Sequence, residues 1–271
     1  MSKKRKIDRR YIFLLIFFGV AIPLIVPLGL HVETSPNVQM VYDLIENTQP
    51  GSKVLISFDY DPASKPELHP MGKAVLKHCF QKDIKVIITA LWPMGVAMAQ
   101  DILSQLQAEF PEAEYGKDYI NMGFKAGAIV TIQAMGKNFR KVFPQDMNGT
   151  DIIEFKILEG VEDFSDFSFA FSLSAGAPGI KEWVMIAHDK YNLTTSGGTT
   201  AVTAPSILPY VNDLNQLTGL LGGLKAAAEY EQLIKSPGTA TSGMDAQSIA
   251  HLIIIIFILI ANINYWRNKK N

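Results

Sequence analysis

The segments at residues 52–60, SKVLISFDY, and residues 84–93, IKVIITALWP, decide the fold class of this chain. Each is a nearly continuous run of apolar residues, whereas a strand with one exposed face alternates apolar and polar residues. Continuous runs are typical of strands that are buried on both faces, in sheets that helices cover on each side. These two segments therefore predict neighbouring strands of a parallel sheet between helical layers.

Helical segments separate the predicted strands. Residues 35–51 carry apolar side chains at helical spacing, and residues 64–82 begin with SKPE, a capping-box pattern. Further helices are predicted at residues 95–110, 128–142, 179–192 and 207–235, and further strands at residues 117–124, 166–175 and 197–205. The alternation predicts an α/β domain with a doubly wound, mostly parallel sheet of about five strands in three layers. It resembles flavodoxin-like and receiver-like folds in this general way, which carries no activity with it.

Two apolar segments flank this predicted domain. Residues 11–30 contain no Asp, Glu, Lys or Arg, and neither do residues 248–266. Because a helix needs ~20 apolar residues to cross a bilayer, we expect transmembrane helices at 11–30 and 247–266 around an α/β domain at 31–246. A cleaved signal peptide is the alternative for the first segment. Its apolar run is longer than the usual ~7–15 residues and no A-x-A site follows, so we expect an uncleaved anchor.

Basic residues flank both apolar segments and predict the orientation. The terminal segments 1–10 and 267–271 hold nine of the 25 basic residues and one of the 26 acidic residues. Since basic flanks stay in the cytoplasm, we expect both termini there and the domain on the extracytoplasmic side, in the periplasm if the membrane is a bacterial inner membrane. The rest of the chain carries 16 basic and 25 acidic residues, an acidic excess that excludes nucleic acid as a partner.

Cysteine and histidine usage limits the chemistry of the chain. Cys79 is the only cysteine, which excludes an internal disulfide, and the five histidines show no zinc-site spacing. We therefore expect no cofactor and no metal held by soft ligands. Magnesium or calcium at Asp59 and Asp61 is the one metal site that the sequence suggests.

The first predicted strand ends at this pair of aspartates, in the sequence FDYDPAS. An apolar strand followed by D-x-D resembles the haloacid-dehalogenase phosphotransferases. The resemblance implies Asp59 as nucleophile, Asp61 as acid/base and magnesium between them, with Thr89 in place of the family's second-strand hydroxyl. It covers about ten residues and fails in two places. Ala63 stands where the family has Thr or Val, and no carboxylate follows the fourth strand.

A structural reading of the pair competes with the enzymatic one. Asp-Pro favours the start of a turn, and aspartate side chains accept hydrogen bonds from the backbone that follows them. In that reading the aspartates end a strand and begin a helix. Ligand binding without catalysis is the third reading.

Ligands of open α/β sheets bind outside the carboxyl ends of the strands. Besides Asp59 and Asp61, the candidate ligand-binding residues at those ends are Trp92, Lys125, Ser174, Gly176 and Gly179. The last three belong to SAGAPG, a glycine-containing turn before a helix, which lacks the GK[ST] of a phosphate-binding loop.

These observations favour a non-catalytic accessory or scaffold subunit of a membrane complex, with a protein partner or a second copy of the chain. The alternatives are an anchored hydrolase or phosphatase that uses Asp59 and Asp61, and an anchored protein that binds a small ligand at the strand ends.

Overall fold

The computed structural model describes residues 9–269, and its centre is a six-stranded parallel sheet. The strands are β1 (Lys53–Asp59), β2 (Lys85–Ala90), β3 (Tyr119–Phe124), β4 (Ala170–Ser174), β5 (Thr195–Thr199) and β6 (Leu221–Gly222). Their order is β3-β2-β1-β4-β5-β6, the order of doubly wound Rossmann-type sheets. The predicted α/β class is thereby confirmed. The extra strand, β6, has two residues and lies inside the segment predicted to be helical, too short to leave a periodic signal.

Alternate side chains of the central strand face two different helical layers. Val54, Ile56 and Phe58 pack into a core with α2 (Pro36–Glu46), α3 (Lys65–Gln81), α4 (Gly95–Glu109) and α10 (Gly223–Leu233). Leu55 packs on the opposite face, with residues of α5 (Ile129–Met135), α6 (Phe139–Val142) and α7 (Ile180–Trp183). All three side chains on the first face and Leu55 on the second are fully buried, as the continuous apolar run predicts.

Several predicted boundaries differ from the observed ones in the second half of the domain. The helix predicted at 128–142 is divided into α5 and α6, because Gly136 ends the first and the Asn138 side chain caps the second. A 3₁₀ turn (Phe164–Asp166) delays the start of β4 to Ala170, and β5 begins two residues before the predicted strand. After α7 the helix continues as a π-helical turn (Val184–His188) and α8 (Asp189–Tyr191). α9 (Ala204–Ile207) and a 3₁₀ turn (Leu208–Tyr210) precede β6.

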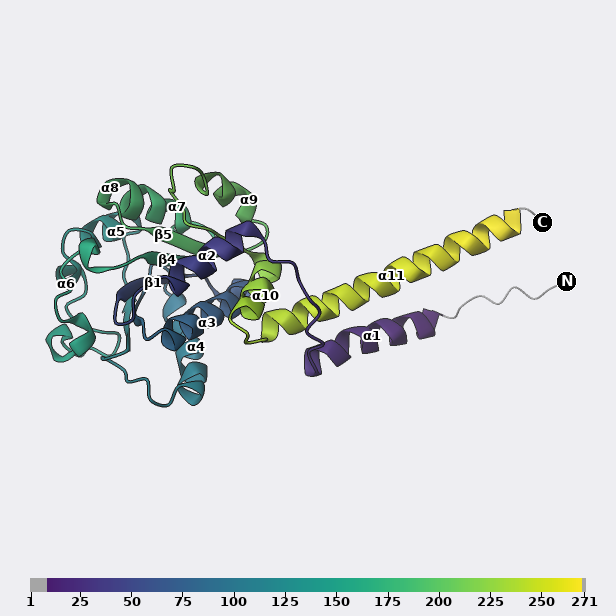
Figure 1. Ribbon diagram of the computed structural model, residues 1–271, viewed down its shortest axis with the longest axis horizontal. Helices are drawn as coiled ribbons and strands as arrows, with labels where there is room; N and C mark the ends of the chain where they lie inside the picture. The colour runs from purple at the N-terminus through teal and green to yellow at the C-terminus, as the bar shows by residue number, and fades with distance from the viewer. Residues whose placement is uncertain (1–8, 270–271) are drawn as a thin grey trace.

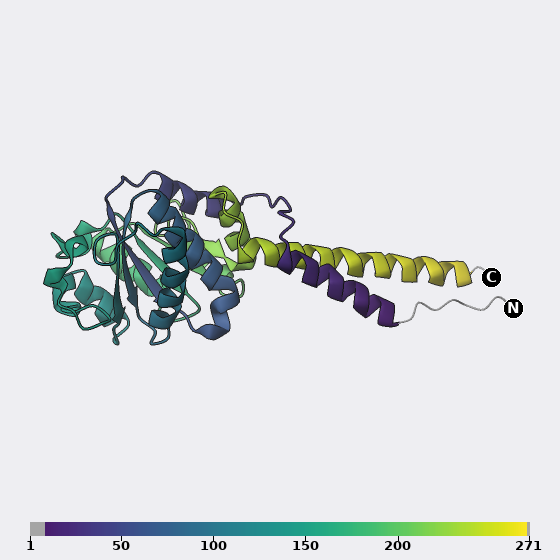
Figure 2. The same cartoon turned by 90° about the horizontal axis from the view of Figure 1, so that it is seen from below.

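A pair of helices extends away from the domain. α1 (Arg9–Ile25) and α11 (Thr239–Lys269) lie side by side, with the start of α1 and the end of α11 farthest from the domain (Figures 1 and 2). They approach closely at Gly19, where an added Cβ would lie 2.5 Å from Ile253 Cδ1. Large apolar side chains of both helices are exposed, including Phe13, Phe17 and Leu259.

One helix among residues 9–269 is long and apolar enough to cross a membrane, the Thr239–Arg267 part of α11. It begins eight residues before the predicted span, because the segment expected to be a linker is helical from Thr239. α1 has 17 residues, ~25 Å of helix, and ends at Ile25, two residues before Pro27. The second span that the sequence predicts is therefore not confirmed.

Buried carboxylates join the helix pair to the domain. The Asp245 carboxylate accepts hydrogen bonds from the backbone N–H groups of Leu28, Gly29 and Leu30 at 2.8, 2.9 and 3.0 Å. Glu231 of α10 accepts from the N–H groups of Gly238 (2.8 Å) and Thr241 (2.8 Å), at the start of α11. A carboxylate is favourable there because the first N–H groups of a helix lack partners within the helix and carry partial positive charge.

A second contact fixes the segment that connects α1 to α2. The Glu229 carboxylate accepts from the N–H (2.8 Å) and the hydroxyl (2.7 Å) of Ser35, directly before α2. Gln232 accepts from Val32 N–H (3.3 Å) and donates to the Leu30 carbonyl (2.9 Å). Side chains of α10 and of the first turns of α11 thus hold both the segment that follows α1 and the start of α11, at the domain end of the helix pair.

We predict that Asp245→Ala loosens the segment between α1 and α2. The substitution removes the acceptor of three backbone N–H groups, and hydrogen bonds to a charged group contribute about 1.5–3 kcal/mol each. Glu33 lies exposed in this segment, so cleavage after it by a glutamate-specific protease should become at least tenfold faster in the detergent-solubilised chain. Asp213→Ala, in an exposed loop of the domain, is the matched control. Equal cleavage rates in both variants would show that Asp245 does not hold the segment.

Candidate functional site

The carboxyl ends of β1 and β4 meet at the point where the strand order reverses. β1 is followed in the chain by β2 and β3 on one side of it, while β4, β5 and β6 lie on the other. Asp59 and Ser174, the last residues of β1 and β4, are paired in the register. Such a reversal is the usual ligand position in open α/β sheets, so the fold places these two predicted residues at the expected edge.

Four donors surround the Asp59 carboxylate. Oδ1 accepts from the Ser57 hydroxyl (2.8 Å) and from Leu91 N–H (2.7 Å). Oδ2 accepts from the Ser172 hydroxyl (3.2 Å) and from the Trp183 indole N–H (3.4 Å). A carboxylate offers about four lone-pair positions, so these contacts use its full acceptor capacity. The carboxylate therefore ties β1 to β2, β4 and α7.

Burial decides the acidity of this group. Asp59 has no exposed surface, and its burial raises the pKa of the carboxyl to about 6, against the opposing effect of the four hydrogen bonds. A nucleophile or metal ligand must face the ligand, and no part of Asp59 reaches solvent in this structure.

Asp61 has a separate, local partner. Its side chain accepts from Ala63 N–H at 3.0 Å and caps the 3₁₀ turn Pro62–Ser64 that leads into α3. This is the turn geometry that Asp-Pro favours. The capping box expected at residues 64–67 is not formed. Ser64 makes no capping bond, and Glu67 accepts from Ala201 N–H (2.8 Å) in the loop after β5.

The turn SAGAPG is closed by three hydrogen bonds. The Trp92 indole donates to the Pro178 carbonyl (2.9 Å), Ile180 N–H donates to the Ser174 hydroxyl (3.2 Å), and Gly179 N–H donates to Glu182 (2.7 Å). The structure thus brings Trp92, Ser174 and Gly179 together, and a Cβ added at Gly176 would lie 3.6 Å from the Trp92 ring. The Trp92 indole, the Ser174 hydroxyl and the Gly179 N–H each have a partner in this turn or in α7, and a ligand role for them stays a prediction.

Lys125 lies apart from these residues. It lines a separate cavity of about 310 Å³ beyond the end of β3, with its ammonium 5.6 Å from the centre of the Phe143 ring. Asp146 lines the same cavity, and its carboxylate accepts from the Tyr115 hydroxyl (2.7 Å) and Thr150 N–H (2.9 Å). Within residues 9–269, no group of three His, Cys, Asp or Glu side chains could hold a metal ion.

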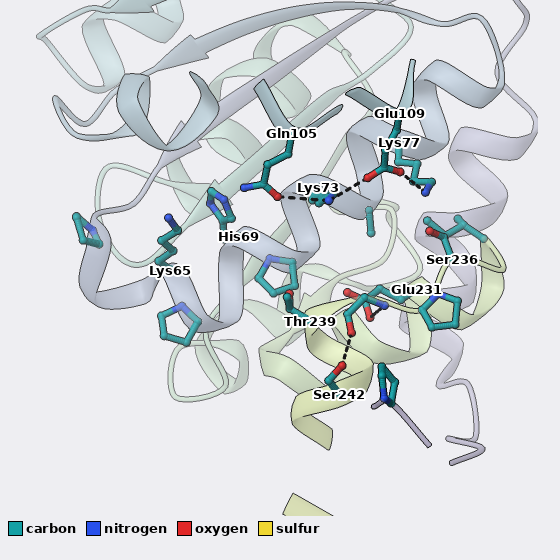
Figure 3. Close-up of a pocket in the computed structure, with 18 residues that line it drawn as sticks. Lys65, His69, Lys73, Lys77, Gln105, Glu109, Glu231, Ser236, Thr239 and Ser242 are labelled. Atoms are coloured by element: carbon teal, nitrogen blue, oxygen red, sulfur yellow. Dashed lines mark hydrogen bonds and ion pairs between the residues drawn. The ribbon is translucent and has the colours of Figure 1, made fainter. Parts of the chain in front are cut away.

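A cavity of about 780 Å³ lies along α3, between the domain and the base of the helix pair (Figure 3). One face of α3 contributes Lys65, His69, Lys73 and Lys77, at steps of four residues. Lys65 pairs with Asp101, while Lys73 (3.0 Å) and Lys77 share Glu109, both acids being on α4.

His69 is the buried polar group of this cavity. Its Nδ1 lies 3.1 Å from the Tyr60 hydroxyl, while its Nε2 has no hydrogen-bond partner and lies 3.3 Å from Asp101 Oδ2 without hydrogen-bond geometry. Burial, and then the Lys65 ammonium, lower the pKa of His69 to about 4, so the imidazole is neutral at neutral pH. The sequence predictions did not include these residues. A signal for them exists, because basic side chains recur every fourth residue at 65–77 and polar or acidic side chains every fourth residue at 101–109.

We predict that Asp59 makes the domain less stable as the pH rises from about 4 to about 6. Its pKa is raised from 3.8 to about 6, so the folded state binds the proton more tightly and the carboxyl's contribution is fully present only below pH 3.8. The free energy of unfolding therefore falls as the pH rises through 6. The total loss is about 3 kcal/mol, since one pKa unit corresponds to about 1.36 kcal/mol. Chemical unfolding of the wild type and of Asp59→Asn across pH 4–7 measures the difference.

The expected result is that Asp59→Asn lacks this loss. Asp61→Asn, two residues away, is the matched control with the same chemical change. If the difference in unfolding free energy between the wild type and Asp59→Asn stays constant from pH 4 to pH 7, the raised pKa of Asp59 is contradicted.

We predict opposite tolerance at two glycines of the SAGAPG turn. In Gly179→Ala the new Cβ would lie 2.4 Å from the Gly176 carbonyl oxygen and 2.4 Å from Ser174 Oγ, so the turn must move. We expect a loss of about 1–3 kcal/mol in unfolding free energy. In Gly176→Ala the Cβ would lie 3.6 Å from the Trp92 ring, an ordinary contact, and stability should stay within ~0.5 kcal/mol. Equal effects, measured by thermal unfolding, would contradict this packing.

No protein-family model matches the chain, and no curated protein matches it.

Proposed function

We propose that this chain is a non-catalytic accessory or scaffold subunit of a membrane complex, whose α/β domain is held at one membrane surface by α1 and α11. The observation that carries the proposal is the junction at Asp245, Glu231 and Glu229. Three buried carboxylates bind backbone N–H groups at the domain end of the helix pair: Asp245 binds those after α1, Glu231 those at the start of α11, and Glu229 that of Ser35 before α2. We infer that these contacts hold the domain in a fixed position relative to the pair. A tethered enzyme needs no such fixed orientation, whereas a subunit that presents one surface to a partner does.

Both helices are part of the proposed anchor. α11 has the length and composition of a span, and α1 packs along it with its apolar side chains exposed. The apolar surface continues beyond α1 through the exposed Val26, Leu28 and Leu30, which supports a second crossing. Basic residues next to both far ends support cytoplasmic termini and an extracytoplasmic domain, in a bacterial inner membrane by our proposal.

The alternative of a haloacid-dehalogenase-like phosphatase finds little support in the geometry. Its nucleophile would be Asp59, which is buried and accepts four hydrogen bonds, and its acid/base would be Asp61, which caps a turn. The Thr89 hydroxyl is buried without a hydrogen-bond partner and is not among the donors to Asp59. An anchored ligand-binding protein is the better second candidate, because the cavity of about 780 Å³ along α3 offers a volume typical of small-molecule sites.

We predict labelling from the extracytoplasmic side only. Cys79 is buried, and burial raises the pKa of its thiol to about 12, so the native cysteine stays unlabelled and need not be removed. Ile153 is 79% exposed, so Ile153→Cys should react with a membrane-impermeant maleimide in intact cells. Ser2→Cys, in the basic N-terminal segment, is the matched control and should react only after the membrane is opened. Labelling of Ser2→Cys alone in intact cells would overturn the orientation.

The same membranes test the proposed role. An amine-reactive cross-linker should convert the chain into a discrete heavier adduct, and a chain that remains monomeric would overturn the assignment as a subunit. Magnesium-dependent phosphatase activity of the purified chain that falls at least 100-fold in Asp61→Asn would favour the enzymatic alternative instead.

A further inference from the structure

The cavity along α3 lies at the level where the helix pair meets the domain. Its rim includes Pro27, in the segment that leaves α1, and Thr239 and Ser242, in the first turn of α11 (Figure 3). The exposed apolar residues Val26 and Leu28 flank Pro27. If α1 and α11 lie in a bilayer, as proposed above, this rim lies at the depth of the lipid headgroups.

Three lysines gather in this cavity, and the first of them, Lys65, is paired with Asp101 of α4. Outside the terminal segments the chain has nine more acidic than basic residues, yet three lysines line this one cavity (Figure 3). Lys73 and Lys77 share one carboxylate, that of Glu109. The other acidic lining residue, Glu231, already accepts hydrogen bonds from the start of α11. Since an ammonium carries three N–H donors, the lysines keep donors for a further anion.

His69 supplies an independent sign of a ligand. Its imidazole is 8% exposed, lines the cavity and leaves Nε2 without a hydrogen-bond partner. In the neutral tautomer that accepts from the Tyr60 hydroxyl at Nδ1, Nε2 carries the hydrogen. A buried donor without a partner costs about 1–3 kcal/mol. Nε2 has almost no accessible surface and lies 3.3 Å from Asp101 Oδ2, so a ligand oxygen would recover this cost only after the His69 side chain shifts.

We propose that this cavity binds the phosphate group of an anionic phospholipid, with Lys73 and Lys77 as its main ligands and Lys65 and His69 beside them. The lipid tails would follow the apolar side of α1 and α11. Glu109 is then a competing anion that holds the two lysines in place when no phosphate is bound. The proposal rests on the membrane placement proposed above.

The test is the retention of lipid by the full chain in detergent, measured by native mass spectrometry. Phosphatidylglycerol and diacylglycerol with the same acyl chains are offered together, so that the phosphoglycerol headgroup is the only difference. The wild type should retain phosphatidylglycerol in preference. The double variant Lys73→Gln/Lys77→Gln should bind it at least tenfold less tightly, because charge-assisted hydrogen bonds are lost. Lys137→Gln/Lys181→Gln, on exposed positions elsewhere in the domain, is the matched control and should bind as the wild type does.

Glu109→Gln separates ligand binding from structural support. It removes the same ion pairs as the lysine variant, so a purely structural role predicts the same direction of change for both. The proposal predicts opposite directions, with phosphatidylglycerol retention raised severalfold by Glu109→Gln. Retention that does not distinguish the two lipids, or that the lysine variant leaves unchanged, overturns the proposal.

A titration with inorganic phosphate distinguishes a lipid headgroup from a free anion. Lysine-dependent thermal stabilisation by millimolar phosphate, without preference for phosphatidylglycerol, would overturn the lipid assignment in favour of a soluble phosphate compound. A separate experiment tests the proposed membrane placement. That placement is overturned if alkaline carbonate extracts the chain from membranes. Lysine-independent lipid retention in a chain that resists carbonate overturns this proposal alone.

Discussion

The burial of β1 on both faces is the constraint on which the rest of the structure depends. A central parallel strand must be covered by a layer on each side, because its backbone and its apolar side chains cannot face water. Val54, Ile56 and Phe58 require the layer of α2, α3, α4 and α10, and Leu55 requires the layer of α5–α7. Each crossover that supplies these layers returns the chain to the same edge of the sheet, so the carboxyl ends of the strands collect there.

The polar side chains at that edge form hydrogen bonds that hold neighbouring strands together. Ser57, Asp59 and Ser172 lie near the carboxyl ends of β1 and β4, on the face of the sheet that α5–α7 cover. Trp183 of α7 donates a hydrogen bond to Asp59 there. A buried carboxylate is costly, and four hydrogen bonds reduce that cost while fixing β1 against its two neighbours and α7. This explains how a sequence can end a central strand in a carboxylate at the usual ligand position and still leave that carboxylate out of solvent. An acid at a strand end can bind a ligand or hold the strands together, and the complete burial of Asp59 with its four hydrogen bonds favours the second role.

The sequence predicts local structure better than it predicts which side chains meet. The strands with continuous apolar runs, β1 and β2, lie where the pattern places them, and α3 and α4 follow their helical spacing. β6 and the break between α5 and α6 escape prediction, because two strand residues and a cap at Asn138 leave almost no periodic signal. The topology brings Asp59, Trp92 and Ser174 to the same edge of the sheet, at or just after the ends of β1, β2 and β4. Lys125 is not gathered with them, because β3 is at the edge of the sheet and its end opens on a different cavity.

The cavity along α3 could not be located from the sequence because no single segment builds it. Its lysines come from α3, the carboxylate that they share comes from α4, and its rim comes from the two ends of the helix pair. Only the corner held by Glu231 and Asp245 brings Pro27 and Ser242 to the same side of the domain as Lys73. The carboxylates at the junction therefore do more than attach the domain. They set the distance between the lysines of α3 and the apolar helix pair, and under the proposal above that distance decides which part of a lipid the lysines reach.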